Sequence, residues 1–287
     1  MAEGRRSITI SIFSTSAGNG KTLTAVNLAA CLAADGYAVC VVDLDLQFGD
    51  VANYLGLTPK YTIADAQLAL ERGDEEFDVL DYLTEYHTQD WGGNDLEFFV
   101  LARPPMIFDA YGVSIPIVEH IINSLQWFNF VIIDMNAAFS ALNLAVLDTS
   151  TIINYIGVVD YLPAIKNYKL GYDTLIRFEY EESKIRLVEN RFSSKKLIRT
   201  RDIERLLGEK FFHHLPNDFK AVTQSIHECK PLMFSAPESK LTQSIMELAA
   251  SYTNKQKDED DEDVVAVKKQ NFIQTLIGKV GKIFHRG

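Results

Sequence analysis

The residues best suited to chemistry stand in one short segment near the start of the chain, S-T-S-A-G-N-G-K-T at residues 14–22. A small-residue turn exposes backbone N–H groups, and a helix that follows it adds the positive end of its dipole. Lys21 supplies a full positive charge, and the Thr22 hydroxyl is suited to bind Mg²⁺. The segment therefore predicts a phosphate-binding loop. Its predicted ligand-binding residues are Ala17, Gly18, Asn19, Gly20, Lys21, Thr22 and Leu23.

The segments on either side have the periodicities that such a loop requires. Residues 7–13 are rich in β-branched residues and alternate between apolar and polar, which predicts a strand. Residues 22–34 carry apolar side chains at helical spacing. The loop departs from the common pattern G-x-x-x-x-G-K-[ST], because Thr15 stands where the first glycine is expected. An ordinary strand-to-helix turn with a solvated lysine is the alternative, and the flanking strand and helix argue against it.

Carboxylates follow two further apolar runs, as a magnesium-nucleotide site requires. Asp43 and Asp45 come after the run at 39–42, and Asp134 follows Phe130-Val131-Ile132-Ile133. Four apolar residues and then Asp form a Walker-B pattern, in which the carboxylate holds Mg²⁺, often through water. The carboxyl ends of strands in an open α/β sheet face the ligand. A single such Asp could simply cap a helix, but three at one edge predict a site shared with Lys21.

Apolar runs alternate with amphipathic stretches from about residue 7 to residue 252, which is typical of a mostly parallel sheet. The strands are predicted at 7–13, 38–42, 97–102, 129–133, 151–159, 185–189 and 211–215. The helices are predicted at 22–34, 114–125, 140–147, 163–178, 201–208, 218–228 and 239–253. Segment 60–96 is acidic and mixed, and only a helix beginning near Thr62 is expected there.

The bulk composition fits one large α/β domain. The chain has 287 residues, 47% of them hydrophobic, and a net charge of −11. From this charge we expect no general affinity for nucleic acid, although residues 184–205 form a basic stretch that is either a DNA contact or a solvated connection. Three widely spaced cysteines favour a reducing, cytoplasmic location. We expect no signal peptide and no membrane-spanning run.

The combination of Gly18-Asn19-Gly20-Lys21-Thr22, the run D-L-D-L-Q-F-G-D at 43–50 and the run at 130–134 resembles the ParA/MinD superfamily of P-loop ATPases. Within it, the run at 43–50 resembles the CpaE/TadZ branch, which is associated with assembly of Tad (Flp-type) pili. Shorter similarities lie at 101–105, 188–191 and 215–218. The likeness covers about residues 7–253, and it implies a three-layer α/β/α P-loop NTPase with a mostly parallel twisted sheet.

The resemblance implies ATP and Mg²⁺ as ligands and assigns roles to individual residues. Lys21 and Thr22 would bind phosphate and magnesium, and Asp134 would be the Walker-B acid. Asp45 would position or activate the attacking water, so Asp45 and Lys21 are the catalytic candidates. Asp43 would lie near the metal, so Thr22, Asp43 and Asp134 are the metal candidates.

The adenine would be recognised by residues farther along the chain. Asn190, at the end of a predicted strand, would match the residue that reads the base, because its amide donates and accepts together. The Leu215-Pro216-Asn217 turn, with Pro216 as the contact residue, would close over the base.

One position departs from the superfamily in a way that bears on catalysis. The superfamily usually has a second, signature lysine at the start of its loop, and here that position is Ser16, followed by Ala17. In the family, that lysine reaches across a nucleotide-sandwich dimer and stabilises charge much as an arginine finger does. Nucleotide binding does not depend on it. We therefore expect slow ATP turnover or none. The sequence predicts a homodimer as one possibility and does not decide the oligomeric state.

The end of the chain changes composition sharply. Residues 1–254 form the predicted ATPase domain, 255–267 an acidic flexible linker, and 268–287 an amphipathic helix with five basic residues and no acidic one. A basic amphipathic helix after a linker is typical of an element that binds anionic lipid surfaces. Docking on the protein's own core or in the groove of a partner protein are the alternatives.

Together these observations predict an ATP-binding localisation protein of the CpaE/TadZ type. It would lie in the cytoplasm, peripherally at the inner face of the cell membrane, and would position a pilus or secretion assembly by contacting its proteins. Two alternatives remain open: a non-hydrolysing nucleotide-dependent scaffold, and an ATPase for DNA partitioning or division-site positioning.

Overall fold

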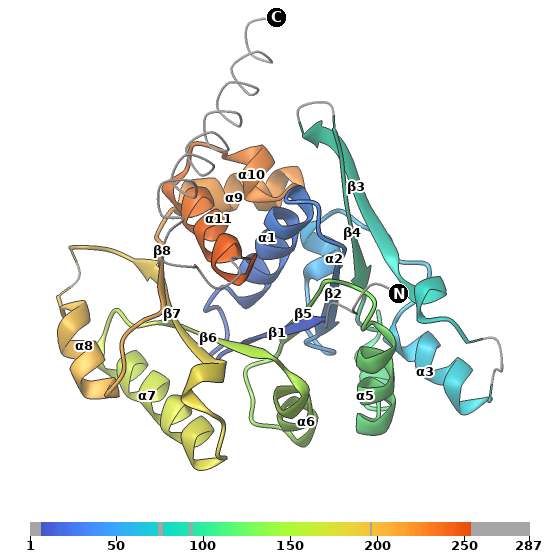
Figure 1. Ribbon diagram of the computed structural model, residues 1–287, viewed down its shortest axis with the longest axis horizontal. Coiled ribbons are helices and arrows are strands. Elements are labelled where there is room, and N and C mark those ends of the chain that lie inside the picture. Colours follow the sequence, from blue (N-terminus) through green and yellow to red (C-terminus); the bar gives the residue numbers. More distant parts are fainter. Residues whose placement is uncertain (1–6, 74–76, 92–93, 196, 254–287) are drawn as a thin grey trace, which may run out of the picture.

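The computed structural model describes residues 7–73, 77–91, 94–195 and 197–253. Its centre is an eight-stranded sheet with the order β3-β4-β2-β5-β1-β6-β7-β8 (Figure 1). The strands are β1 (Ile8–Phe13), β2 (Val39–Leu44), β3 (Thr84–Trp91), β4 (Asn94–Leu101), β5 (Phe130–Met135), β6 (Ile152–Val158), β7 (Ile185–Phe192) and β8 (His213–Pro216).

The pairing confirms a mostly parallel sheet. Every pair is parallel except β3 with β4, which is antiparallel. All seven predicted strands are present, with ends that differ by a few residues. Strand β3 lies in the segment whose structure the sequence left open. Its residues T-E-Y-H-T-Q-D-W are mostly polar, which suits a strand that has only one neighbour and lies at the edge of the sheet.

Helices cover both faces of this sheet (Figure 1). They are α1 (Lys21–Ala34), α2 (Val51–Tyr54), α3 (Ile63–Glu71), α4 (Ile107–Ala110), α5 (Ile115–Ser124), α6 (Ala141–Thr149), α7 (Leu162–Arg177), α8 (Thr200–Leu207), α9 (Phe219–Glu228), α10 (Leu232–Ser235) and α11 (Lys240–Thr253). The seven predicted helices and the start of α3 are confirmed. The four-residue helices α2, α4 and α10 were not predicted, because one turn is too short for a periodic pattern.

Two apolar clusters form the core, one on each face of the sheet. Phe130 and Ile132 of β5 pack with α1, α10 and α11, whereas Val131 and Ile133 pack with α5, α6 and α7. The alternation follows from the two-residue period of a strand. A strand covered on both faces favours apolar residues on both sides, which explains the continuous run Phe130-Val131-Ile132-Ile133 in β5. The architecture is therefore the three-layer α/β/α arrangement that was predicted.

Some of the sequence predictions concern residues that the structure does not describe. The acidic linker at 255–267 and the amphipathic helix at 268–287 lie outside the described residues, so both remain predictions. Among the helices that the structure does describe, none combines the length and the apolar character needed to span a bilayer.

Candidate nucleotide-binding site

The predicted phosphate loop connects β1 to α1, at the carboxyl edge of the sheet. Gly18 and Gly20 both have left-handed backbone angles, with φ of +73° and +84°, which residues with a Cβ atom rarely adopt. A Cβ on Gly20 would also collide with the side-chain amide of Asn190. Helix α1 begins directly afterwards at Lys21. The two glycines therefore allow the chain to turn sharply into the helix while β7 lies close against it.

Side chains of the loop support its shape from within. The buried Ser14 hydroxyl accepts hydrogen bonds from the backbone N–H of Ser16 (3.3 Å) and from the Asn19 amide (2.8 Å). Thr15 shares a hydrogen bond of 3.0 Å with the hydroxyl of Tyr155 on β6. Thr15 thus explains why the common glycine is missing at this position: its side chain ties the loop to the sheet.

Lys21 and Thr22 lie on the first turn of α1 and face β5. The Thr22 hydroxyl donates a hydrogen bond of 2.6 Å to Asp134 Oδ2. Lys21 is buried, with 8% of its surface exposed, and its charge acts to lower the pKa of Asp134. The structure therefore brings the predicted phosphate lysine and magnesium threonine, which are neighbours in the chain, together with the predicted Walker-B carboxylate, which follows Thr22 by 112 residues.

Asp43 joins this group from the neighbouring strand. Asp43 of β2 and Asp134 of β5 are register partners, and both are almost fully buried. Burial raises the pKa of Asp134 to about 7, against the opposing effects of Thr22 and Lys21. The pKa of Asp43 is raised well above its ordinary value by burial and by the charge of Asp134. Two acidic side chains at close range in a dry site resist ionising together.

These residues fit a magnesium ion in its usual protein setting. One oxygen of each carboxylate, Asp43 Oδ1 and Asp134 Oδ1, is buried without a hydrogen-bond partner among the described residues. Within that same part of the chain, no group of three or more His, Cys, Asp or Glu side chains could hold a metal by itself. Mg²⁺ usually uses one or two carboxylates together with phosphate oxygens and water, so the donors present match a nucleotide-bound ion.

Asp45 lies just beyond β2, in a tight turn that runs to α2. Its carboxylate accepts a hydrogen bond from Phe48 N–H (3.2 Å), and its carbonyl accepts one from Gly49 N–H (2.6 Å). The negative charge of Asp45 acts to raise the pKa of both Asp43 and Asp134. The structure thus puts the predicted water-positioning residue next to the predicted metal residues; its role remains a prediction.

Two residues of this region were not among the candidates. Gly49 lies against the Asp43 carboxyl so closely that any Cβ would collide with it. Arg103 Nε donates a hydrogen bond of 2.6 Å to the Gly49 carbonyl, and the arginine charge acts to lower the pKa of Asp43. Arg103 lies in the segment at 101–105, whose similarity to the CpaE/TadZ branch could have pointed to it, although no role was predicted for it.

The predicted base-reading residues lie at the ends of β7 and β8. Asn190 is buried, and its amide donates a hydrogen bond of 2.8 Å to the Asn19 carbonyl of the phosphate loop. Its Oδ1 accepts one from the Arg191 backbone N–H (2.8 Å). Pro216 ends β8 beside Phe192. The structure thus connects Asn190 directly to the loop, whereas contact of Asn190 and Pro216 with a base remains a prediction.

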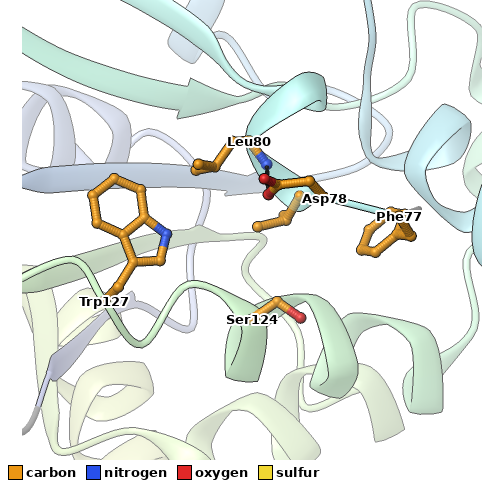
Figure 2. A pocket seen from close by; sticks show the side chains of 6 residues that line it. Phe77, Asp78, Leu80, Ser124 and Trp127 are labelled. Carbon is orange, nitrogen blue, oxygen red and sulfur yellow. Dashed lines mark hydrogen bonds between the residues drawn. The ribbon is translucent and has the colours of Figure 1, made fainter. Parts of the chain in front are cut away.

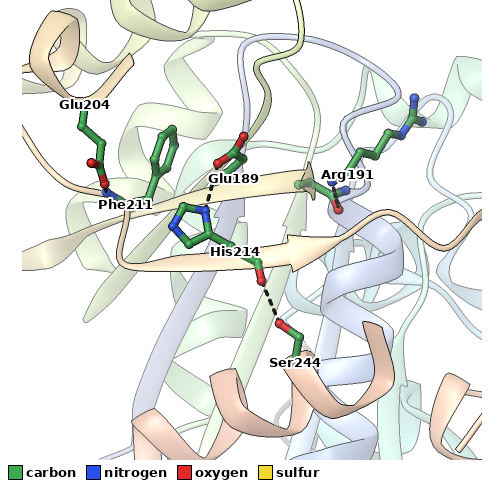
Figure 3. A network of polar contacts seen from close by, with 7 residues as sticks. Glu189, Arg191, Glu204, Phe211, His214 and Ser244 are labelled. Carbon is green, nitrogen blue, oxygen red and sulfur yellow. Dashed lines mark hydrogen bonds and ion pairs between the residues drawn. The ribbon is translucent and has the colours of Figure 1, made fainter. Parts of the chain in front are cut away.

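A buried carboxylate next to Asn190 was missed entirely. Glu189 has 1% of its side chain exposed, and its carboxylate lies 2.9 Å from Nδ1 of His214 on β8 (Figure 3). Ser244 of α11 donates a hydrogen bond of 2.8 Å to the His214 carbonyl. These contacts give His214 a structural role, because they join β7, β8 and α11.

A surface hollow of about 330 Å³ lies elsewhere, lined by η1 (Val79–Tyr82) and by residues at and after the end of α5. Figure 2 shows Trp127 on one side of it and Phe77 on the other, with Ser124 below. None of the candidate site residues lines it. This hollow is therefore separate from the site that the phosphate loop forms at the carboxyl edge of the sheet.

Comparison with known protein families decides the assignment. Residues 10–229 match the model of the "CobQ/CobB/MinD/ParA nucleotide binding domain". The chain belongs to this family. The family's matched region includes the loop, Asp43, Asp45, Asp134 and Asn190, and it leaves out α11. A search among curated proteins gave no match.

Solved structures of this family share the fold. A ParA family ATPase from Chlorobium tepidum is 22% identical, with a TM-score of 0.75 over 86% of this chain and 99% of that one. The cell division ATPase MinD from Pyrococcus furiosus is 23% identical, with a TM-score of 0.70 over 86% and 98%. The septum site-determining protein MinD from Pyrococcus horikoshii, solved with Mg-ADP, is 20% identical, with a TM-score of 0.70 over 91% and 98%. These identities establish the fold alone.

Proposed function

We propose that this protein binds ATP with Mg²⁺ in the loop at 14–22 and hydrolyses it slowly or not at all. The observation that carries the proposal is the 2.6 Å hydrogen bond from Thr22 to Asp134, with Lys21 beside it. It places a hydroxyl, a carboxylate and a cation where a phosphate-bound magnesium would need them. That the Pyrococcus horikoshii relative was solved with Mg-ADP supports the same ligand here.

Each residue then has a defined task at the site. The N–H groups of residues 17–23 and Lys21 would hold the phosphates. Thr22, Asp43 and Asp134 would hold Mg²⁺, which supplies charge neutralisation between the phosphate oxygens. Asp45 would orient the attacking water, and Asn190 and Pro216 would contact the base. Ser16 carries no charge. The signature lysine that reaches across the dimer in the superfamily is therefore missing, and ATP turnover is slow or absent.

Replacing Lys21 tests the phosphate loop. Lys21→Ala should weaken binding of labelled ATP by at least roughly a hundred-fold, since a charge-assisted contact in a partly buried site is lost. Lys169→Ala is a matched control, because among the described residues Lys169 forms an ion pair only with Asp173, on the surface of α7. Steady-state phosphate release measured beside binding separates a slow ATPase from a scaffold. Retained ATP affinity in Lys21→Ala would refute the assignment of the loop.

We also propose that the protein is of the CpaE/TadZ type and acts at the membrane. The run D-L-D-L-Q-F-G-D at 43–50 supports the branch, and the basic amphipathic pattern at 268–287 supports attachment to anionic lipid. Its partners would be proteins of a pilus or secretion assembly. Reversible attachment would allow the nucleotide state to decide where the protein accumulates.

Removal of the tail tests attachment. A chain that ends at Asp263 should lose co-sedimentation with vesicles that contain anionic lipid, because each basic residue contributes about 1 kcal/mol near such a surface. The full chain with Lys279→Glu and Lys282→Glu is the matched control: it keeps the length and should also bind weakly. Undiminished binding by the shortened chain would refute the anchor.

The main competing function is a scaffold in which ATP is a structural ligand. Ser16 at the signature position favours it, since the site then retains binding without the cation for turnover. Partitioning of DNA is a weaker alternative. Salt-sensitive retention of the protein on DNA would favour it, and no retention would exclude it.

A further inference from the structure

Strand β7 contacts the backbone of the phosphate loop through two adjacent side chains. Asn190 Nδ2 donates a hydrogen bond of 2.8 Å to the Asn19 carbonyl. Arg191 Nη2 donates one of 3.0 Å to the Gly18 carbonyl. The two carbonyls belong to consecutive peptide units. Both are therefore turned toward the end of β7.

The direction of these carbonyls fixes the direction of two N–H groups. In a trans peptide unit the N–H points opposite to the C=O, and the described chain has no cis bond. The Asn19 N–H opposes the Gly18 carbonyl, and the Gly20 N–H opposes the Asn19 carbonyl, so both point away from β7. Within the described part of the chain, neither N–H donates a hydrogen bond to the backbone or to a side chain. Successive N–H groups that face one way form a concave anion site.

The chain holds Arg191 in an unusual conformation to make this contact. Its φ is +52°, in the left-handed region that is unfavourable for a residue with a Cβ. The β7–β8 register shifts between Glu189 and Phe192, so Arg191 lies in an irregular segment that redirects its side chain. The Glu189–His214 contact joins the two strands directly before this irregularity, and Figure 3 shows Arg191 extending from the far end of β7.

We propose that Arg191 is a positioning residue of the phosphate loop. By holding the Gly18 carbonyl, it keeps the Asn19 N–H turned toward the phosphates of a bound nucleotide. Asn190 does the same for the Gly20 N–H, so the end of β7 orders the anion site before the ligand arrives. This inference rests on the proposed nucleotide binding. The sequence patterns predicted no role for Arg191.

The test compares ligands with and without a base, on the full chain with Mg²⁺ present. Arg191→Asn keeps a residue that tolerates left-handed angles, but its side chain is too short to reach Gly18. Calorimetry should show ATP and inorganic tripolyphosphate both binding roughly ten-fold more weakly, the effect of losing one charge-assisted hydrogen bond. Arg191→Lys should restore part of both affinities. Arg205→Asn is the control, because Arg205 is an exposed residue of α8 whose only ion pair within the described part of the chain is with Asp202.

A second readout concerns the loop itself. In the nucleotide-free protein, Arg191→Asn should shift the amide NMR signals of Asn19 and Gly20, while signals of α8 stay in place. If Arg191→Asn does not fold, Arg191→Gly serves in its place, because glycine adopts this backbone angle most easily.

Three results would overturn the inference. The first is unchanged affinity for both ligands. The second is weaker ATP binding with unchanged tripolyphosphate binding, which would place Arg191 at the base or the sugar. The third is a loss that disappears at high salt, which would mean long-range charge attraction instead of geometry. In each case Lys21→Ala distinguishes this failure from failure of the proposed function, because that variant must still lose ATP affinity.

Discussion

At the scale of single residues, the site consists of acidic groups that the fold keeps out of water. Asp43 and Asp134 are register partners at the buried ends of two central strands. Burial raises the pKa of both, and the pKa of Asp134 rises to about 7. An aspartate whose pKa is higher when folded than when unfolded stabilises the fold at low pH. That contribution is lost as the pH rises through the folded pKa.

Asp134→Asn should therefore stabilise the nucleotide-free protein at pH 8, on the order of 1 kcal/mol or more, and should stabilise it clearly less at pH 5, which lies between the unfolded and the folded pKa of Asp134. The asparagine cannot ionise and can still accept the Thr22 hydrogen bond. The measurement is the free energy of unfolding from urea titrations at both pH values. Some pH dependence should remain, because Asp43 keeps its raised pKa.

The surface variant Asp173→Asn is the control for this prediction, since Asp173 is partly exposed on α7. A difference between wild type and Asp134→Asn that does not grow from pH 5 to pH 8 would contradict it.

At the scale of elements, a polar network connects α1 to the helices around it. The Asn27 amide donates a hydrogen bond of 3.1 Å to the Tyr54 hydroxyl, and Asn27 Oδ1 accepts one of 2.6 Å from the Leu232 N–H. Tyr54 also bonds to Ser225 of α9 (2.6 Å). All of these side chains are buried. Helix α2, which follows the Asp45 turn, is thereby tied to the helix that carries Lys21.

Asn27→Leu should lower the free energy of unfolding by about 2–3 kcal/mol, because the Leu232 N–H then has no partner in the core. The shift of the urea midpoint measures the loss. Asn167→Leu, on the exposed side of α7, provides the control and should change the midpoint little. Equal midpoints for the two variants would show that the network contributes nothing to stability.

The same elements show what a sequence can predict here. The helix at 22–34 follows from its apolar spacing, and the structure places Asn27 on its buried face. Its partners did not follow, since Tyr54, Ser225 and Leu232 come from segments brought together only by the fold. Asp43, Asp134 and Lys21 could be grouped beforehand, because parallel strands deliver their ends to one edge. The contact of Arg191 with Gly18 could not, because it depends on a left-handed residue in an irregular strand.

At the scale of the whole molecule, the question is whether ATP links two copies of the chain. Ser16 stands at the position of the signature lysine, half-buried at the start of the loop. In the ParA/MinD superfamily, which this chain resembles, a lysine at this position reaches the phosphates bound by the other subunit of a dimer. Lys21, Thr22 and Asp134 stand together as the nucleotide-binding proposal requires, so the missing charge is the feature to restore.

Ser16→Lys should raise ATP turnover at least ten-fold, because cations supplied across such interfaces are worth roughly 10³ or more in rate. It should also produce an ATP-dependent dimer. Phosphate release and light scattering after size exclusion measure the two effects. Ala17→Lys adds the same charge one position away and should produce neither. No gain from Ser16→Lys would mean that another feature keeps the chain from turning over ATP.

The order of the strands has one more consequence. Three adjacent inner strands carry the predicted phosphate and metal residues: Lys21 and Thr22 follow β1, Asp43 lies on β2, and Asp134 lies on β5. The edge strand β8 carries Pro216, and its neighbour β7 carries Asn190. Local opening requires least free energy at edges and most in a doubly covered centre. The proposed phosphate half of the site should therefore open only with the core, whereas β8, the edge strand that carries Pro216, should open at a lower free energy.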